Sequence, residues 1–383
     1  MLIALGATFG SSRVFAEAPR AIEWSTVTAS PSPVGHEDLS SLERRSLDVC
    51  GASEVGLRSL AQMLAATMAF SRHLPDASTL AWQERASGDP HPWPRVWAVS
   101  ARTLDVDESL SRLRRWLAGE HLVGLLRCGV AERVAPDGTR VLIVVAVDGI
   151  ADLYPVRRSV RVGEWLDVQA LFRVSVHHAK VVVLGPSGAP RMLLTSMDGP
   201  SVRARFAPDR NGMFTLQIIG EVAGGPRPLL EATVFAGIDP PRFPSDDSAP
   251  GERISVGAMG DDDILAAMMN AARTESGLAP MRRSVPLDSV ARAHASAMAK
   301  ERELAHDVGD GAPAERFAAA GVVGVEIGEN VARADSVGLA HRQIWNSPSH
   351  RANLLSDKFT STGVAVVRDA RGELWIAEEF GGR

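Results

Sequence analysis

Apolar positions fall at helical spacing early in the chain and at strand spacing soon after. The segments LSSLERRSLDVC (39–50) and LRSLAQMLAATMAF (57–70) carry apolar residues three and four positions apart, which predicts two amphipathic helices. RCGVAERVAPDGTRVLIVVAV (127–147) has two apolar runs around the turn Pro136–Gly138, a pattern typical of a β-hairpin. The region 37–150 is therefore predicted to be a mixed domain of helices and strands.

Helical spacing disappears between residues 151 and 238. In EWLDVQALFRVSV (164–176) apolar residues occupy alternate positions, as in a half-buried strand. The stretches 180–196 and 201–219 are each predicted to form two strands around a turn that contains glycine or proline. This pattern predicts an all-β sandwich, with a structural or adhesive role because no recognisable site lies in it.

The segment DPPRFPSDDSAPGER (239–253) is rich in proline, serine and aspartate, which predicts an extended linker over residues 239–260. Helical patterning resumes at residue 261 and lasts to about Phe317, and the strands STGVAVVRDARGELWIAEEF (361–380) close the chain. Residues 261–383 are therefore a third predicted domain, and the fold class of the whole chain is α+β.

Three segments of the first domain return in the last domain in the same order. SLAQMLAATMA (59–69) matches SVARAHASAMA (289–299), WLAGEHLVGLL (116–126) matches WNSPSHRANLL (345–355), and CGVAERVAPDG (128–138) matches TGVAVVRDARG (362–372). Matches that keep their order along the chain indicate an internal repeat. We expect the region 37–150 to be a second, degenerate copy of the C-terminal domain.

The amino-acid composition and net charge limit which classes of molecule this chain is expected to bind. The chain has 383 residues, 45% hydrophobic and 23% charged, with a formal net charge of -5, which is typical of a soluble globular protein. A mildly acidic chain is a poor match for nucleic acid or an anionic membrane surface. Its apolar runs are shorter than the roughly 18 residues that a transmembrane helix needs.

The cysteines and the N-terminus bear on cellular location. Cys50 and Cys128 fit either one disulfide in an exported protein or two buried free thiols. The apolar run Leu2–Phe9 and the small-residue pattern Ala16–Ala18 are similar to part of a secretion signal, without its basic n-region. We therefore expect residues 1–36 to be signal-like or disordered, and the protein to be extracellular or in the cell envelope. A disordered tail on a cytoplasmic protein is the alternative.

The segment IWNSPSHRANLL (344–355) places a histidine at the start of a predicted helix. Ser347 suits the N-cap and Pro348 the first helical position, which puts His350 at the third. The helix dipole disfavours a cation there, so the imidazole should be neutral and able to ligate a metal or act as a base. The alternative is that His350 caps its own turn or packs under Trp345.

Two further candidates lie upstream. His306 follows a predicted helix, and Glu329 lies in EIGENVARA, where Gly328 predicts a tight turn and Asn330 a side-chain-to-backbone hydrogen bond. The separations of 23 and 21 residues between His306, Glu329 and His350 differ from local metal motifs. Spacing alone does not bring the three together, and a surface position for His306 and Glu329 stays open.

The C-terminal region resembles the bacterial branch of the CAP superfamily, which includes cysteine-rich secretory proteins, insect antigen 5 and plant pathogenesis-related proteins. The matching segments, in chain order, are LAAMMNAARTESGLAPM (265–281), the helix 289–299, LAH (304–306), GEN (328–330), WNSPSHRANLL (345–355) and the closing strands. The resemblance implies an α-β-α sandwich with a cleft in which His306, Glu329 and His350 converge.

Many members of this family have a second acidic residue before the second histidine. This chain has Asn346, Ser347 and Pro348 after Trp345, so Glu326, Glu378 or Glu379 would have to substitute. In the first copy His121 takes the place of His350, Trp97 falls near the position of Glu329, and His73 is a loose counterpart of His306. Without the carboxylate, no active site is expected in the first copy.

Three functions follow from these residues. His306 and His350 could hold a divalent ion such as zinc, with Glu329 as a ligand or orienting a water. The first function is an extracellular module that binds a lipid, glycan or protein without catalysis. The second is a metal-dependent hydrolase or peptidase that uses His306, Glu329 and His350. The third is an architectural cell-surface protein whose cleft is a relic.

Overall fold

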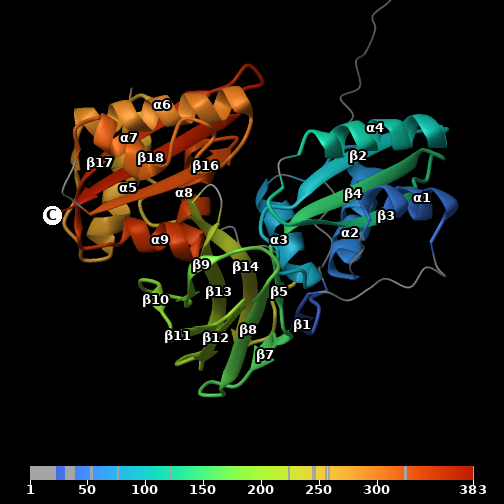
Figure 1. The fold of residues 1–383 in the computed structure, drawn as a ribbon, viewed down its shortest axis with the longest axis horizontal. Helices are drawn as coiled ribbons and strands as arrows, with labels where there is room; N and C mark the ends of the chain where they lie inside the picture. The colour runs from blue at the N-terminus through green and yellow to red at the C-terminus, as the bar shows by residue number, and fades with distance from the viewer. Residues whose placement is uncertain are drawn as a thin grey trace, which may run out of the picture.

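The computed structural model describes residues 23–30, 39–51, 55–75, 77–120, 122–222, 225–243, 247–254, 257, 259–322 and 326–382. Two mixed domains of helices and strands flank one end of a β-sandwich (Figure 1). The predicted α+β fold class is confirmed, and each domain has its own buried apolar core.

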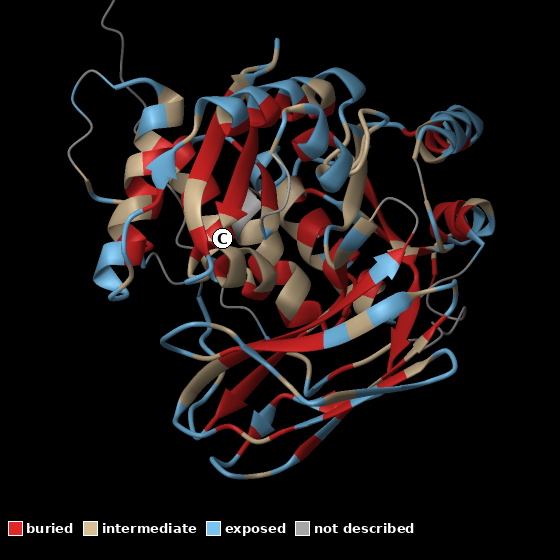
Figure 2. Ribbon diagram, turned by 60° about the vertical axis from the view of Figure 1, so that its left-hand side comes forward, coloured by how far each residue is buried: buried red, intermediate tan, exposed pale blue. Residues whose placement is uncertain are grey.

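The C-terminal domain is a sheet with helices on both faces. It consists of α5 (Asp261–Glu275), β15 (Arg282–Arg283), α6 (Val285–Glu301), α7 (Pro313–Ala319), β16 (Ile327–Ala334), α8 (Val337–Asn346), α9 (Pro348–Leu354), β17 (Phe359–Arg368) and β18 (Leu374–Gly382). The strand order is β15-β17-β18-β16. Figure 2 shows these strands mostly buried between the helices.

Alternate side chains along each strand of this domain pack against the helix layers on opposite faces of the sheet. On β17, Ala365 packs with residues of α6, whereas its neighbours Val364 and Val366 pack with residues of α5 and α8. Successive side chains of a strand point to opposite faces, so a continuous apolar run here serves both helix layers. The predicted α-β-α sandwich of this domain is confirmed.

The N-terminal domain has the same plan in shorter form. It consists of α1 (Ser41–Cys50), α2 (Val55–Ser71), α3 (Ala77–Ser87), β2 (Arg95–Ala101), α4 (Val106–Ala118), β3 (Leu125–Val134) and β4 (Arg140–Gly149). Its sheet order is β2-β4-β3, with α2 packed on one face and α1 and α4 on the other.

The middle domain is a β-sandwich, as the alternating pattern predicts. Its strands are β5 (Ala151–Leu153), β6 (Val156–Arg157), β7 (Ser159–Val160), β8 (Leu166–Phe172), β9 (His177–Leu184), β10 (Arg191–Met192), β11 (Thr195–Asp198), β12 (Ser201–Phe206), β13 (Gly212–Val222) and β14 (Gly225–Ala236). They form one sheet of order β10-β9-β13-β14-β7 and another of order β11-β12-β8-β5. One apolar core fills the space between the two sheets.

The N-terminal and C-terminal domains have equivalent sheet orders, and in each a strand glycine lies very close to the backbone of a helix. A Cβ atom on Gly363 of β17 would lie 2.0 Å from the carbonyl carbon of Leu287 on α6. A Cβ atom on Gly129 of β3 would lie 2.0 Å from the same atom of Leu57 on α2. The glycines and leucines occupy equivalent positions in the two domains, in line with the sequence matches between them.

A second contact recurs at the opposite face of each sheet. In the C-terminal domain, Asp262 in the first turn of α5 accepts a hydrogen bond from the backbone N–H of Val366 at 2.8 Å. In the N-terminal domain, Glu43 in the first turn of α1 accepts from the backbone N–H of Glu132 at 2.9 Å. Val366 and Glu132 are each three residues beyond the close-contact glycine, so the first helix docks at the same place in both domains.

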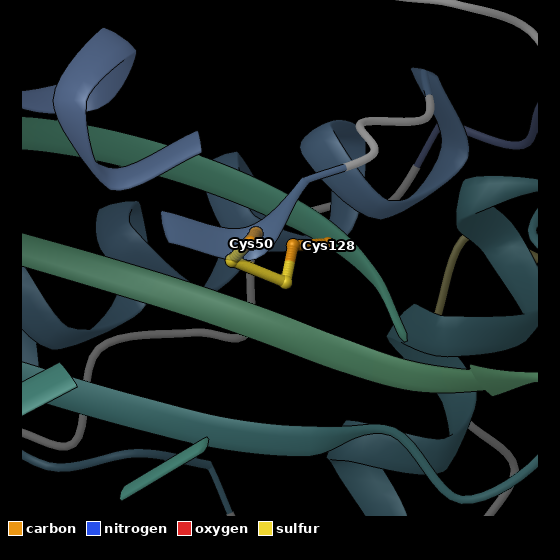
Figure 3. Close-up of a disulfide and its surroundings, with 2 residues drawn as sticks. All are labelled: Cys50 and Cys128. Atoms are coloured by element: carbon orange, nitrogen blue, oxygen red, sulfur yellow. A yellow bond between two sulfur atoms is a disulfide. The ribbon is translucent and has the colours of Figure 1, made fainter. Parts of the chain in front are cut away.

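The cysteines form a disulfide, which settles the two alternatives that the sequence left open. Cys50 ends α1 and Cys128 lies on β3, 78 residues apart in the chain (Figure 3). Both residues are buried in the N-terminal core. The bond therefore ties α1 to the sheet that it covers.

Parts of two segments predicted to lack structure are packed. Within the predicted N-terminal tail, β1 (Val27–Thr28) pairs with β6, and the ring of Trp24 contacts Trp82 and Phe235 edge-on. In the predicted linker, residues 247–254 lie against the C-terminal domain, where Glu252 pairs with Arg342. Residues 1–22 and 31–38, which hold the signal-like motif, lie outside the described residues. In the described ranges, the helices are all too short or too polar to cross a bilayer.

We predict that Gly363→Ala and Gly129→Ala each destabilise their own domain by at least about 2 kcal/mol, because the added methyl group forces a helix away from its sheet. Gly338→Ala is the matched control, since its Cβ would meet only the Glu252 side chain at 3.7 Å. This control should be neutral or slightly stabilising, as alanine favours the helix. Denaturant unfolding measures all three variants, and equal effects at the three positions would contradict the packing argument.

Candidate functional site

The structure brings His306 and Glu329 into direct contact. His306 lies in the loop after α6, and Glu329 lies on β16 rather than at the tight turn that Gly328 predicted. The Nδ1 atom of His306 donates to Oε1 of Glu329 at 2.6 Å. This hydrogen bond leaves Nε2 of His306 as the nitrogen available to a metal or ligand.

Glu329 is a buried carboxylate with both oxygens engaged. Its side chain is 2% exposed, and the guanidinium of Arg316 on α7 donates to Oε2. Burial alone would raise the pKa of Glu329, but the hydrogen bond from His306, and the attraction of that ring in its protonated form, hold the pKa at about 2. Glu329 is therefore ionised at neutral pH and has no free oxygen for a reacting proton.

Behind this contact lies a polar cluster that the sequence did not reveal. His294 on α6 is fully buried, with Nδ1 2.7 Å from Oδ2 of Asp310 and Nε2 3.0 Å from the carbonyl oxygen of Ala305. Asp310 lies 3.5 Å from Arg316, which itself donates to the carbonyl oxygen of His306 at 2.9 Å. A lone histidine or arginine in an alanine-rich helix carries no local signal of such a network.

Of the three acids that could substitute for the missing family acid, Glu379 is the one beside the site. It pairs in register with Glu329 across β16 and β18. Burial and the negative charge of Glu329 raise the pKa of Glu379 well above its usual value, which favours its neutral form beside the ionised Glu329. Glu326 instead pairs with Lys358 at 2.7 Å on the surface.

His350 is the third residue of α9, as predicted, but a different domain completes its helix start. Ser347 stands at the N-cap without making a side-chain capping bond. Instead the N–H of Ser349 donates to Oε1 of Gln217 on β13, at 3.1 Å. Burial, and then repulsion from the protonated form of His306, lower the pKa of His350 to about 4. The imidazole is neutral at pH 7 as expected, with burial rather than the helix dipole as the main cause.

Two asparagines fix the backbone of His350 against β16. Asn330 donates from Nδ2 to the carbonyl oxygen of His350 at 3.2 Å and to Oε2 of Glu378 at 2.9 Å. Asn353 donates to Oδ1 of Asn330 at 3.0 Å. Asn330 does make a side-chain-to-backbone bond, but it reaches the distant carbonyl oxygen of His350 from a strand rather than closing a turn.

The contact of α9 with the sandwich is part of a polar chain across all three domains. Gln217 accepts from Ser349, and its Nε2 donates to Oε2 of Glu231 on β14 at 3.3 Å. The other oxygen of Glu231 accepts from Nε of Arg85 on α3 at 2.9 Å. One cross-strand pair of the sandwich thus holds α9 on one side and the N-terminal domain on the other.

His306 and His350 offer two imidazoles as candidate metal ligands. In the described part of the chain, neither Nε2 of His306 nor the ring of His350 has a hydrogen-bond partner. Within the same residues, no group of three or more His, Cys, Asp or Glu side chains is arranged to hold a metal. Glu329 suits the role of an outer carboxylate that orients a ligating histidine. Remaining coordination positions would be filled by water or by a bound ligand.

The N-terminal domain shows what this region looks like without polar groups. Strand register pairs Gly363 and Glu329 with Glu379, and it pairs Gly129 and Val96 with Val145. Val96 therefore stands where Glu329 does, one residue before Trp97, which the sequence placed near that position.

The substitutions extend to the neighbouring positions. Val145 stands in place of Glu379, Val144 in place of Glu378, and Leu64 in place of His294. Apolar residues thus replace His294 and all three of these strand glutamates. His73 lies at the exposed end of the loop after α2, and His121 lies outside the described residues.

Comparison with known proteins assigns the C-terminal domain. The model of the cysteine-rich secretory protein family, CAP, matches residues 266–378, so this domain is a CAP domain. A search of curated protein sequences found no match. The family match leaves the first two domains unassigned.

Three similar solved structures come from bacteria. An outer surface protein from Borrelia burgdorferi has 20% identity over 34% of this chain and 96% of its own, with a TM-score of 0.31. An extracellular protein containing a SCP domain from Bacillus anthracis has 16% identity over 61% of this chain and 86% of its own, with a TM-score of 0.30. A cysteine-rich secretory protein from Staphylococcus aureus has 13% identity over the same shares, 61% and 86%, with a TM-score of 0.27.

We predict that Glu378→Gln stabilises the protein at alkaline pH. Burial raises the pKa of Glu378 to about 7, so the folded state keeps a proton that the unfolded chain releases at pH ~4.3. Raising the pH through this window favours unfolding of the natural protein but not of the variant. The pH dependence of their free energies of unfolding should agree below pH ~4 and diverge by roughly 3 kcal/mol at pH ~8.

The exposed Glu326 provides the control, since Glu326→Gln should follow the natural protein at every pH. Thermal or urea unfolding as a function of pH measures the difference. If Glu378→Gln and the natural protein lose stability in parallel above pH ~5, Glu378 does not hold its proton in the folded state.

Proposed function

Because residues 266–378 are a CAP domain, we propose that this chain is an exported binding protein whose C-terminal cleft holds a ligand without hydrolysing it. The proposed site lies between His306 and His350, with Glu329 on the far nitrogen of the His306 ring. The main support for this proposal is that both carboxylate oxygens of Glu329 already accept hydrogen bonds, one from His306 and one from Arg316. A ligand of the extracellular space, whether lipid, glycan or protein, is the partner class that we infer.

Hydrolysis needs a base within reach of a water or hydroxyl. Glu329 is a poor base at a pKa of about 2, and the raised pKa of Glu379 beside it favours its neutral form. His350 is neutral and could accept a proton, but its pKa of about 4 makes it a weak acceptor at neutral pH. These properties favour binding over a metal-dependent hydrolase.

We further propose that a divalent ion such as zinc binds between His306 and His350. Neutral imidazole nitrogens are good zinc ligands, and a carboxylate on the far nitrogen of a ligating histidine strengthens it. When bound, the ion would supply a Lewis-acidic position for an oxygen or nitrogen of the ligand. The protein's own part is to orient His306 through Glu329 and to hold α9 in place through Gln217.

Duplication of the CAP domain is the third element of the proposal. The shared strand order, the equivalent close contacts of Gly129 and Gly363, and the equivalent first-turn carboxylates support it. The first copy, in which leucine and valine replace His294 and the three strand glutamates, serves a structural role here. An architectural role for the whole chain would instead require the C-terminal cluster to be equally dispensable.

Export is the fourth element of the proposal, and three observations support it. The Cys50–Cys128 disulfide is of a kind that persists in oxidising compartments. The family whose model matches residues 266–378 is described as one of secretory proteins. The signal-like pattern at residues 1–36 agrees with this location.

We predict that the full chain binds zinc and that His306→Ala and His350→Ala each abolish measurable binding. Glu329→Gln should weaken zinc affinity by about 10–100-fold without abolishing it, because the carboxylate orients a ligand rather than ligating. Isothermal titration and native mass spectrometry measure both effects.

His177→Ala is the matched control, since His177 lies exposed on β9 of the sandwich domain, and it should bind zinc as the natural protein does. Unchanged zinc binding in His306→Ala would remove the metal site. Zinc-dependent turnover of ester or peptide substrates that Glu329→Gln abolishes would replace the binding proposal with the hydrolase.

A further inference from the structure

A polar cavity lies where the N-terminal domain meets the sandwich, away from the CAP cleft. Its volume is about 100 Å³, and its polar lining includes Thr28, Glu84, Asp89, Arg158, Glu231 and Thr233, beside the ion-paired Arg85. The wall is held by backbone contacts between the two domains, including one from the N–H of Glu231 to the carbonyl oxygen of Pro90 at 2.7 Å. Junctions between domains are a common place for small-ligand sites.

Arg158 is the main feature of this cavity. Its side chain is 2% exposed, its guanidinium lies over the ring of Trp24 at 5.0 Å, and Nη2 donates to the carbonyl oxygen of Arg85. Among the described residues, Nε and Nη1 have no hydrogen-bond partner. Burial lowers the pKa of Arg158 to about 10, so the group is still charged at neutral pH. A buried cation without a counter-ion is costly unless something outside the chain pairs with it.

The acids that line the cavity do not supply that counter-ion. Glu231 accepts from Arg85 at 2.9 Å, and Oδ1 of Asp89 contacts the ring of His91 at 2.8 Å. Burial, and then the charge of Glu231, raise the pKa of Glu84 well above its usual value, which favours the neutral form. Arg158 is thus a charge in this lining that lacks a counter-ion in the part of the chain described.

Three further polar atoms of the lining lack partners within the described residues. They are Oδ2 of Asp89, which can only accept while ionised, and the hydroxyl oxygens of Thr28 and Thr233. Buried polar atoms in folded proteins nearly always have partners, so atoms left over around one cavity indicate something that fills it. The unpaired atoms therefore offer an anion the N–H groups of Arg158 and the two threonine hydroxyls as donors. They offer a hydroxyl group one acceptor, Oδ2 of Asp89.

Trp93 marks the mouth of the cavity. It lines the cavity while its side chain stays 48% exposed, and its φ of 61° lies in the left-handed region. A bulky residue seldom adopts that conformation, and such strain clusters at binding sites.

We propose that this cavity binds a small oxyanion that also carries a hydroxyl group. A short hydroxy-carboxylate and monobasic phosphate share that chemistry. The guanidinium of Arg158 meets the negative charge, Oδ2 of Asp89 accepts from the hydroxyl, and the threonine hydroxyls complete the contacts. The volume suits about three waters at roughly 30 Å³ each, or one ligand of about five non-hydrogen atoms.

The test is isothermal titration of the full chain with sodium glycolate, sodium phosphate and sodium acetate, with chloride keeping the ionic strength constant. Glycolate or phosphate should bind at one saturable site, and the tighter of the two identifies the ligand class. Acetate should bind at least about tenfold more weakly, because it leaves Asp89 without a donor. Arg158→Met should weaken binding by at least about tenfold.

Two threonine variants test the site independently, in case Arg158→Met fails to fold. Thr233→Val removes a hydroxyl from the lining and should weaken binding several-fold. Thr215→Val is the control, since Thr215 is the buried cross-strand partner of Thr233 and lies outside the cavity lining. It should bind as the natural protein does.

Three results would overturn the proposal. The absence of saturable binding with all three salts would mean that the cavity holds ordered water only. Equal affinity in Arg158→Met, or in Thr233→Val, would remove the site from this cavity. Acetate binding as tightly as glycolate and phosphate would contradict the role assigned to Asp89.

Discussion

The buried negative charge of Glu329 sets the arrangement of the C-terminal site. A carboxylate that is 2% exposed must be paired, and His306 and Arg316 supply the two partners from the loop after α6 and from α7. Arg316 also binds the carbonyl oxygen of His306, so the same residue fixes both the acid and the loop that carries the histidine. The orientation of His306 therefore depends on its contact with Glu329 and on Arg316, which holds them both.

Position of the second histidine depends on the sandwich rather than on the CAP domain alone. Gln217 caps the first turn of α9 and is itself bonded to Glu231, which pairs with Arg85 of the N-terminal domain. The first and last domains therefore each contact one of two adjacent strands, β14 and β13, in the same sheet of the sandwich. This gives the middle domain, in which the sequence shows no site, a definite structural task beside the cleft.

The sequence predicted the large-scale fold because apolar periodicity reports burial directly, and it predicted the helix position of His350 because proline and serine are strong helix-start signals. It missed Gln217 and Arg316, since no local pattern distinguishes a polar residue that will be buried by a distant element. It placed Trp97 near the position that Val96 takes, and the difference matters because a slip of one residue in a strand exchanges the two faces. Gly328 indicated a turn, but the structure uses its missing side chain to admit the ring of Phe359, which a Cβ atom would meet at 2.7 Å.

The central claim is that Glu329 stays an ionised, committed partner of His306 at every physiological pH. Carbon-13 NMR of the full chain, labelled at the glutamate carboxyl groups and assigned with Glu329→Gln, measures its titration directly. A pKa of about 2 predicts a carboxyl resonance for Glu329 that stays constant from pH ~4 to pH ~8. A resonance that titrates at or above the ordinary glutamate value of about 4.3 would contradict the account, because the carboxyl group would then be free to act as a base.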